Sequence, residues 1–285
     1  EHGSEKTIVS KFEDTANNDS YILRLENGAP HFYIKIGGSW FGVSDSNILS
    51  LNAWHHVVGV YDGATMKIFI NGVLLNTVAR TGTIDVSTST LKIGGWASGF
   101  NFSGNIDDVR IWNIARTNEQ ITNSKNCEIQ SNTTGLVAYY KFNQGFDAGT
   151  YNASFTTLND ATANANNGTL NNFTLTGNTS NWLSGSVVTS GVVVPAAPLA
   201  NNQIHCQGTN PTVANLTPAP SSTIKWYNVA TGGTQLASTT ALTSGTYYAS
   251  SVNVNGCESE RTSIVVTVNP TPGAPAASAT QTSCD

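Results

Sequence analysis

Charged residues are scarce in this chain of 285 residues, at 11% of the total, against about a quarter in an average globular protein. The net charge is −5 and no basic block occurs, which excludes the electrostatic footprint that nucleic acid or an anionic lipid surface requires. No apolar run approaches the roughly 18 residues needed to span a bilayer. We therefore expect a soluble protein that neither spans a membrane nor binds nucleic acid.

The motifs of common catalytic and metal sites are also missing. The four cysteines form no CxxC pair and have no histidine spacing suited to zinc, and no GxSxG segment is present. The chain has no start methionine and no signal peptide, so we expect Glu1 to be a processed or excised end.

Threonine, asparagine and glycine take the place of charge, with 36 Thr, 32 Asn and 26 Gly. Thr favours pleated surfaces, whereas Asn and Gly supply the turn positions that need positive φ. From residue 6 most segments alternate apolar and polar residues and are bounded by Asn, Asp or Gly, as expected for strands. The sequence predicts an all-β protein.

Two local signals are specific. Asn71-Gly72 lies between alternating apolar runs in KIFINGVLL, which predicts a hairpin with a type I′ turn. Thr117 and Gln120 form a capping-box pattern, which predicts a short helix that ends near Cys127.

The composition divides the chain into four parts. Residues 1–185 are rich in strand patterns, and residues 186–198 form a connector of small residues that ends in proline. Residues 199–270 read as a small β-sandwich, because short strands alternate with Gly/Ser/Thr turns. Residues 271–285 are predicted to start another copy of the same module.

The prediction of a second copy rests on an internal repeat. VPAAPLANNQIHC at 194–206 resembles TPGAPAASATQTSC at 271–284, with a period of about 77 residues. We therefore expect the chain to be a piece of a longer array, with further domains of that chain as neighbours.

The run 54–121 resembles the laminin-G-like and pentraxin-like branch of the concanavalin A-like lectin fold. The matching segments are WHHVVGVYDG, KIFINGVLL, LKIGG and FSGNIDDVRIWNIARTNEQI. The resemblance implies a two-sheet jelly roll whose relatives are carbohydrate-binding or adhesion modules. The family's opening strands should precede residue 6, so either the domain is cut or the segment 135–170 closes it; we favour the second interpretation.

The segment 224–268 resembles the Ig-like repeats of large surface proteins exported by the type IX secretion system of gliding, polysaccharide-using bacteria. The matching residues run from IKWYNVATGG to TSIVVTV. The resemblance implies an extracellular or cell-surface location and a stalk or spacer role. The predicted fold is therefore a concanavalin A-like jelly-roll sandwich followed by a small Ig-like β-sandwich.

Two pairs of adjacent polar residues are candidates for catalytic or metal-binding groups. His55-His56 and Asp107-Asp108 both lie in strand-like segments, where neighbouring side chains point to opposite faces. Adjacent histidines then cannot chelate one ion, and adjacent carboxylates cannot meet the separation of about 5 Å that retaining glycosidases need. The sequence predicts scaffold at both places and no enzyme.

A structural calcium ion is one interpretation of the Asn-rich loop NDATANANNGT. Calcium takes carboxylate, amide and backbone oxygens, and the loop offers Asp160, Asn164 and Asn166. The related family loop reads closer to DxSGNGNNG, and Ala163 and Ala165 replace two of its glycines here. The other interpretation is an ordinary loop of Asx turns.

Aromatic residues are the second resource for sugar recognition, because a ring face stacks on the C–H face of a pyranose. Trp96 follows two glycines and precedes Phe100 in a predicted loop, and Trp40 stands beside Phe41. Trp96, Phe100 and Trp40 are the predicted carbohydrate-binding residues. The competing interpretation places some of these rings in the core.

Cys206 and Cys257 bracket the Ig-like segment with Trp226 between them. We predict a disulfide between them, which would stabilise the fold by about 4 kcal/mol on the chain-entropy model. Cys127 is then left as a buried free thiol, and Cys284 is expected to pair beyond the chain.

One modification is predicted. Asp14-Thr15-Ala16 resembles the short O-glycosylation signal of the same bacterial group, and Thr15 lies in a polar segment.

These features together predict a fragment of a secreted or cell-surface adhesin that binds polysaccharide or cell-surface glycan without catalysis. Two alternatives stay open: an accessory module of a secreted polysaccharide-degrading enzyme, and a purely structural stalk. The sequence specifies neither the glycan nor the oligomeric state.

Overall fold

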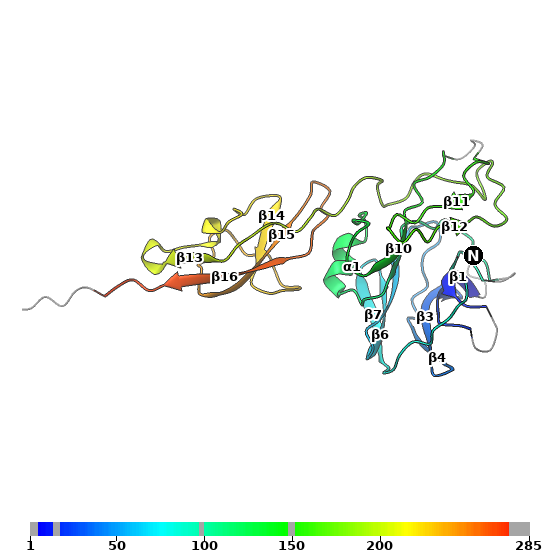
Figure 1. Ribbon diagram of the computed structural model, residues 1–285, viewed down its shortest axis with the longest axis horizontal. Helices are drawn as coiled ribbons and strands as arrows, with labels where there is room; N and C mark the ends of the chain where they lie inside the picture. The colour runs from blue at the N-terminus through cyan, green and yellow to red at the C-terminus, as the bar shows by residue number, and fades with distance from the viewer. Residues whose placement is uncertain (1–4, 14–17, 97–99, 148–151, 274–285) are drawn as a thin grey trace, which may run out of the picture. The chain divides into compact units, whose positions relative to one another are not determined.

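The chain folds into two units, residues 1–194 and 195–285, and their boundary lies inside the predicted connector. The computed structural model (Figure 1) describes residues 5–13, 18–96, 100–147 and 152–273. Strands dominate both units, and the described residues contain a single α-helix, so the all-β prediction is confirmed. No helix in these ranges is long and apolar enough to cross a membrane.

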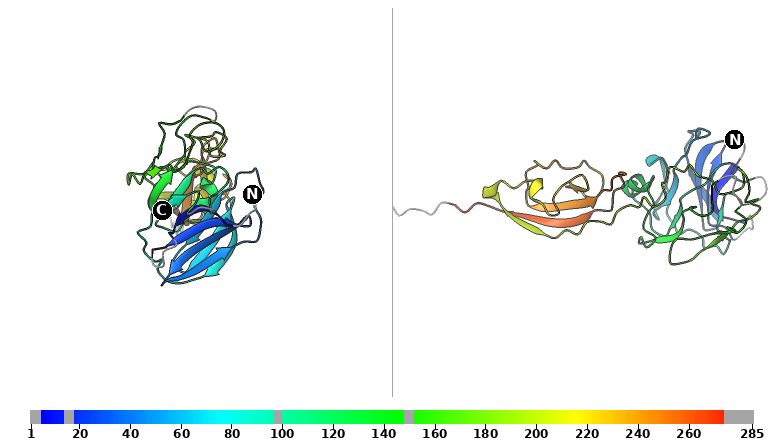
Figure 2. Two further views of the ribbon diagram at one scale, coloured as in Figure 1. Left: turned by 90° about the vertical axis from the view of Figure 1, so that its right-hand side faces the viewer. Right: turned by 90° about the horizontal axis from the view of Figure 1, so that it is seen from above.

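The first unit is built on two antiparallel sheets. The larger has the strand order β4-β3-β2-β1-β8 and the smaller the order β5-β6-β7. β6 and β7 of the smaller sheet lie next to β3 and β4 of the larger one in Figure 1, and Figure 2 gives two further views. The bounds are β1 (Glu5–Lys11), β2 (Tyr21–Glu26), β3 (Ala29–Ile36), β4 (Ser39–Ser44), β5 (Val57–Tyr61), β6 (Thr65–Ile70), β7 (Val73–Ala79) and β8 (Lys92–Ile93).

The two sheets pack through their apolar faces. Phe32, Ile34 and Val43 of the larger sheet contact Met66 and Ile68 of the smaller one, and all five are buried. Because side chains alternate along a strand, the residues next to Ile34 in β3 point away from this core. They lie on the opposite side of the larger sheet, called here the outer face.

The predicted hairpin and helix are both confirmed. Asn71 (φ 53°) and Gly72 (φ 82°) turn β6 into β7 with two positive φ angles, as a type I′ turn requires. The helix α1 (Asn118–Ser124) begins after Thr117, whose side chain accepts from the backbone N–H of Gln120. The Gln120 side chain in turn accepts from the backbone N–H of Thr117. Ile121 of α1 packs on β5 and β6.

The rest of the first unit consists of short strand pairs. β10 pairs antiparallel with β9, and β11 with β12. Their bounds are β9 (Val109–Trp112), β10 (Leu136–Tyr140), β11 (Thr157–Leu158) and β12 (Gly168–Thr169). The segment 135–170 thus supplies strands to the first unit.

The second unit is a four-stranded sheet of order β13-β16-β15-β14, in which β13 runs parallel to β16. Trp226, Ile264 and Val266 of this sheet are buried against Val213 and Leu216. The bounds are β13 (Gln203–Cys206), β14 (Ile224–Tyr227), β15 (Gly245–Ser251), β16 (Thr262–Asn269) and two 3-10 helices, η1 (Gln207–Thr209) and η2 (Val213–Asn215).

The predicted Cys206–Cys257 disulfide is wrong. Cys206 is a free, exposed thiol, whereas Cys127 and Cys257 are both disulfide-bonded, so the prediction of a free Cys127 is wrong as well. The reason is the parallel pairing of β13, which sets Cys206 beside Asn269 at the far end of β16. Cys257 precedes the start of β16, and a strand of this length spans roughly 20 Å, well beyond the limit of about 7 Å between bridged Cα atoms.

Candidate functional site

The three predicted sugar-binding aromatics lie in one cluster with a fourth ring, Phe12. The Phe12 ring centroid lies 5.7 Å from that of Trp40 and 4.4 Å from that of Trp96, both in edge arrangements. Trp96 and Phe100 are stacked, with centroids 4.7 Å apart. We call these four residues the aromatic cluster. It joins segments that are far apart in the sequence.

The strand register places the cluster on the outer face. Trp40 lies directly opposite Lys35 across the β3–β4 pair, and Lys35 follows the core residue Ile34, so both point away from the core. The backbone N–H of Lys35 donates to Ser20 O. This hydrogen bond links β3 to the segment near the end of β1, and Phe12 follows directly after β1. Phe12 was missed from sequence because only this pairing brings it beside Trp40.

A buried ion pair lies beneath the exposed end of the cluster. Lys35 Nζ is 3.2 Å from Asp19 Oδ2, and both side chains are about 95% buried, with relative exposures of 6% and 5%. The same ammonium group lies 5.8 Å from the centroid of the Trp40 ring. Asp19 Oδ1 accepts from the backbone N–H of Glu13, which fixes the segment next to Phe12. The ion pair thus fixes Lys35 and the segment next to Phe12, and both residues adjoin the Trp40 ring.

Trp40 is the ring of the cluster best placed to receive a ligand. It is 36% exposed, and its ring contact within the cluster is with the edge of Phe12. Trp96 is sandwiched by Phe100 and Phe12, and its indole Nε1 is buried without a hydrogen-bond partner among the described residues. Phe12, Trp96 and Phe100 therefore support Trp40. Sugar contact by these residues stays a prediction.

Both histidines precede β5, which begins at Val57, so the premise that they lie within a strand is wrong. His55 Nε2 lies 3.1 Å from Ser50 Oγ and 3.0 Å from Ser50 O. Burial, together with the nearby cations Arg110 and Lys125, lowers the pKa of His56 to about 4. His56 is therefore neutral at pH 7.

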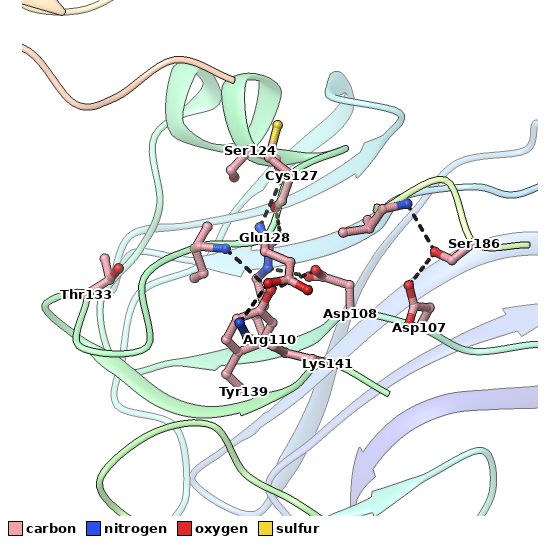
Figure 3. Close-up of polar contacts among 12 residues, drawn as sticks. Asp107, Asp108, Arg110, Ser124, Cys127, Glu128, Thr133, Tyr139, Lys141 and Ser186 are labelled. Atoms are coloured by element: carbon pink, nitrogen blue, oxygen red, sulfur yellow. Dashed lines mark hydrogen bonds and ion pairs between the residues drawn. The ribbon is translucent and has the colours of Figure 1, made fainter. Parts of the chain in front are cut away.

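The acidic pair does not lie within a strand, so that premise of the sequence interpretation is wrong. Asp107 and Asp108 precede β9, and Asp108 has a left-handed φ of 50°. Asp108 forms an ion pair with Arg110 and accepts from Tyr139 Oη at 2.9 Å, whereas Asp107 accepts from Ser186 Oγ (Figure 3). Burial raises the pKa of both carboxyl groups. Each is engaged by a different partner.

The neighbouring cation Arg110 explains why this cluster is structural. Its guanidinium donates to the carbonyl oxygens of Ser124, the last residue of α1, and of Cys127, three residues further on. Glu128 is also occupied, because Lys141 Nζ lies 2.8 Å from its Oε2. Figure 3 shows these groups converging between the helix and β10. The arrangement ties α1 to β9 and β10.

The Asn-rich loop is closed by its own hydrogen bonds. The Asp160 carboxylate accepts the backbone N–H groups of Tyr139, Thr162 and Asn166, each at 2.9 Å, and also the Thr162 hydroxyl. Burial acts to raise the pKa of Asp160, but these donors outweigh it and lower the pKa. The side-chain amides of Asn164 and Asn166 both donate to Val137 O.

This bonding does not suit a cation at Asp160, because a carboxylate offers about four acceptor positions and four donors occupy them. Within the described ranges, no three His, Cys, Asp or Glu residues are grouped to hold a metal ion. Calcium at this loop stays a prediction. Thr15, the predicted glycosylation site, lies outside the described residues.

The first unit is a β-sandwich of two antiparallel sheets, and the second is built on a four-stranded sheet. Residues 1–122 match the family model described as the concanavalin A-like lectin/glucanases superfamily. Residues 195–270 match the model of the CHU_C-associated Ig-like domain. Both matches confirm the arrangement predicted from the sequence.

Individual relatives match parts of the chain. Pappalysin-1 of Mus musculus is 33% identical over 73 residues, which are 24% of this chain and 4% of that protein. A structure of a candidate carbohydrate-binding protein from Bacteroides ovatus is 23% identical, with a TM-score of 0.45 over 58% of this chain and 47% of that one. The IT-sialidase CBM40 of Ruminococcus gnavus, bound to α2,3-sialyllactose, is 15% identical, with a TM-score of 0.29 over 36% and 62%.

Proposed function

We propose that this chain is a non-catalytic part of an extracellular or cell-surface adhesion protein, in which the first unit binds glycan and the second is a spacer. The observation that carries the proposal is the aromatic cluster on the outer face, with Trp40 as its exposed ring. An aromatic ring fixed at the surface beside polar groups is the standard means of stacking a sugar ring.

Two observations support the absence of catalysis. Asp107 and Asp108 are engaged by Ser186 and by Arg110 with Tyr139, so neither carboxylate is left to act on a glycosidic bond as a glycosidase pair would. The aromatic cluster itself contains no acid or base, and the adjacent Asp19 is buried in its ion pair with Lys35. The geometry favours binding.

A glycan array probed with the 285-residue chain tests the proposal. We expect binding that Trp40→Ala weakens about fivefold or more, since one aromatic stacking contact contributes on the order of 1–3 kcal/mol. Phe173→Ala is the matched control, because Phe173 is an exposed aromatic of the same unit outside the cluster. An array with no bound glycan would reject the proposal in favour of a structural stalk.

A further inference from the structure

A second group of side chains occupies the outer face beyond Trp40. Arg24 Nη1 lies 2.7 Å from Glu5 Oε2, and Arg24 Nε donates to Glu26 Oε1 at 2.8 Å. The Tyr33 hydroxyl donates to the same Glu26 oxygen at 2.8 Å, and His31 Nδ1 lies 3.1 Å from the Tyr33 hydroxyl. We call these five residues the Arg24 network.

Tyr33 covers a strand surface that carries no side chain of its own. It lies opposite Gly42 of β4, and a β-carbon at Gly42 would come within 2.5 Å of Tyr33 Cε1. The Tyr33 ring therefore leans across β4 in the place where another residue would put its side chain. The His31 ring is nearly parallel to it, at an interplanar angle of 16°.

The spacing of the two rings follows from the register. Gly42 lies two residues from Trp40 on β4, which is about 7 Å along an extended strand, and both positions belong to the same face. Tyr33 and Trp40 thus stand as successive aromatic surfaces along one line. Neighbouring sugar rings of a single oligosaccharide meet this arrangement, whereas one monosaccharide does not reach both.

The Arg24 network keeps hydrogen-bonding capacity for a ligand. The side chains of Glu5 and His31 are 35% and 19% exposed, and His31 Nε2 has no partner in the part of the chain that the structure describes. Guanidinium and carboxylate groups side by side donate and accept within one patch, as the adjacent hydroxyls of a sugar do. The patch can therefore both donate hydrogen bonds to a ligand and accept them.

The charge of the network selects among sugars. One guanidinium stands against two carboxylates, and burial lowers the pKa of His31, so the network carries a net negative charge at neutral pH. A carboxylated or sulfated sugar would meet like charge here, which costs affinity. A neutral sugar would not.

We propose that the Arg24 network, with Tyr33 as its aromatic ring, forms a second sugar subsite. The outer face then binds a neutral oligosaccharide of at least two sugar residues, which extends from Trp40 to Tyr33. This inference rests on the proposed function and deepens it. The first subsite stacks one sugar ring on Trp40. At the second, the next sugar ring lies against the pair of Tyr33 and Arg24, whose guanidinium is 4.8 Å from the Tyr33 ring centroid, and the carboxylates of the network accept from its hydroxyls.

Calorimetric titration of the full chain with neutral oligosaccharides tests the inference. The probes are cello-, manno- and xylo-oligosaccharides of one to four residues, with oligogalacturonate as the acidic counterpart. We expect affinity to rise at least about tenfold from one residue to the longer chains in at least one neutral series. Oligogalacturonate should bind more weakly than that series.

Substitutions separate the two subsites. Tyr33→Ala and Gly42→Ala should remove the gain with chain length, because one deletes the ring and the other displaces it, while Trp40→Ala should weaken every ligand of the series. Tyr248→Ala, a partly buried strand tyrosine of the second unit, is the matched control. Tyr33→Phe keeps the ring and loses the hydroxyl contacts with Glu26 and His31, so it should keep part of the gain and reports on the site if the alanine variant is unstable.

The outcomes distinguish the inference from the proposed function. Glycan binding that Trp40→Ala weakens, with a length gain that survives in both Tyr33→Ala and Gly42→Ala, overturns the second subsite alone. Tighter binding of oligogalacturonate than of every neutral series overturns the choice of neutral sugars. No binding of any glycan by the unsubstituted chain overturns both.

Discussion

The neutral state of His56 makes the first unit sensitive to acid. His56 is partly buried just before β5, with Arg110 and Lys125 as the nearby cations. Burial and these two charges lower its pKa from 6.5 to about 4. Between pH 6.5 and pH 4, His56 is protonated in the unfolded chain but neutral in the folded chain. The free energy of unfolding therefore falls as the pH falls.

The size of the effect follows from the shift. Each pKa unit corresponds to about 1.4 kcal/mol, so the full contribution is about 3 kcal/mol, present above pH 6.5 and lost by about pH 4. At pH 5 the solution has moved 1.5 units below the unfolded value, and about 2 kcal/mol is lost. Asp107 and Asp108 act in the opposite sense, because their raised pKa values favour the folded state in acid.

Comparison of His56→Gln with the unsubstituted chain isolates this contribution, because the two carboxyl groups act in both proteins. The backbone bonds of residue 56 to Asn71 are kept in the variant. Urea denaturation at pH 7 and pH 5, followed by tryptophan fluorescence, should show about 2 kcal/mol less acid loss in His56→Gln. His55→Gln, whose own imidazole bonds Ser50, is the control. Equal acid losses in His56→Gln and the unsubstituted chain would refute the reasoning.

Three further predictions concern the Asn-rich loop and the free thiol. Asp160→Ala should destabilise the first unit by about 2 kcal/mol or more in urea denaturation, because three backbone N–H groups lose their acceptor. Chelation by EDTA should leave the melting temperature unchanged, since these donors fill the carboxylate, and a melting temperature that rises with added calcium would count against this view. Iodoacetamide should label Cys206 without reductant and leave Cys257 unlabelled; peptide mapping reads this, and the reverse pattern would contradict it.

Local sequence signals predicted the parts of the fold that are decided locally. The Asn71-Gly72 turn depends on two residues that tolerate positive φ, and the start of α1 depends on a reciprocal bond between Thr117 and Gln120. Both are set by residues within a few positions of one another. Neither needs information from a distant strand.

Long-range register was the information that the sequence did not supply. The parallel pairing of β13 with β16 moved Cys206 away from Cys257, and the row from β1 to β4 brought Phe12 beside Trp40. Asp108 has a left-handed φ, so the side chains of the acidic pair do not alternate as they would in a strand. The sequence did not indicate this conformation, because residues other than Gly rarely adopt it. The same limit explains why Tyr33 and the Arg24 network were not foreseen.

The buried Lys35–Asp19 pair bears on the choice between a binding face and a stalk. Removal of two charges from water costs several kcal/mol per ion, and apolar residues of similar volume often give equal or greater stability. A sheet face that served only as structure would gain little from this pair. Its ammonium group lies beside the Trp40 ring, and its carboxylate holds the Glu13 backbone next to Phe12. The pair therefore fixes the position of an exposed ring, which a ligand site needs and a stalk does not.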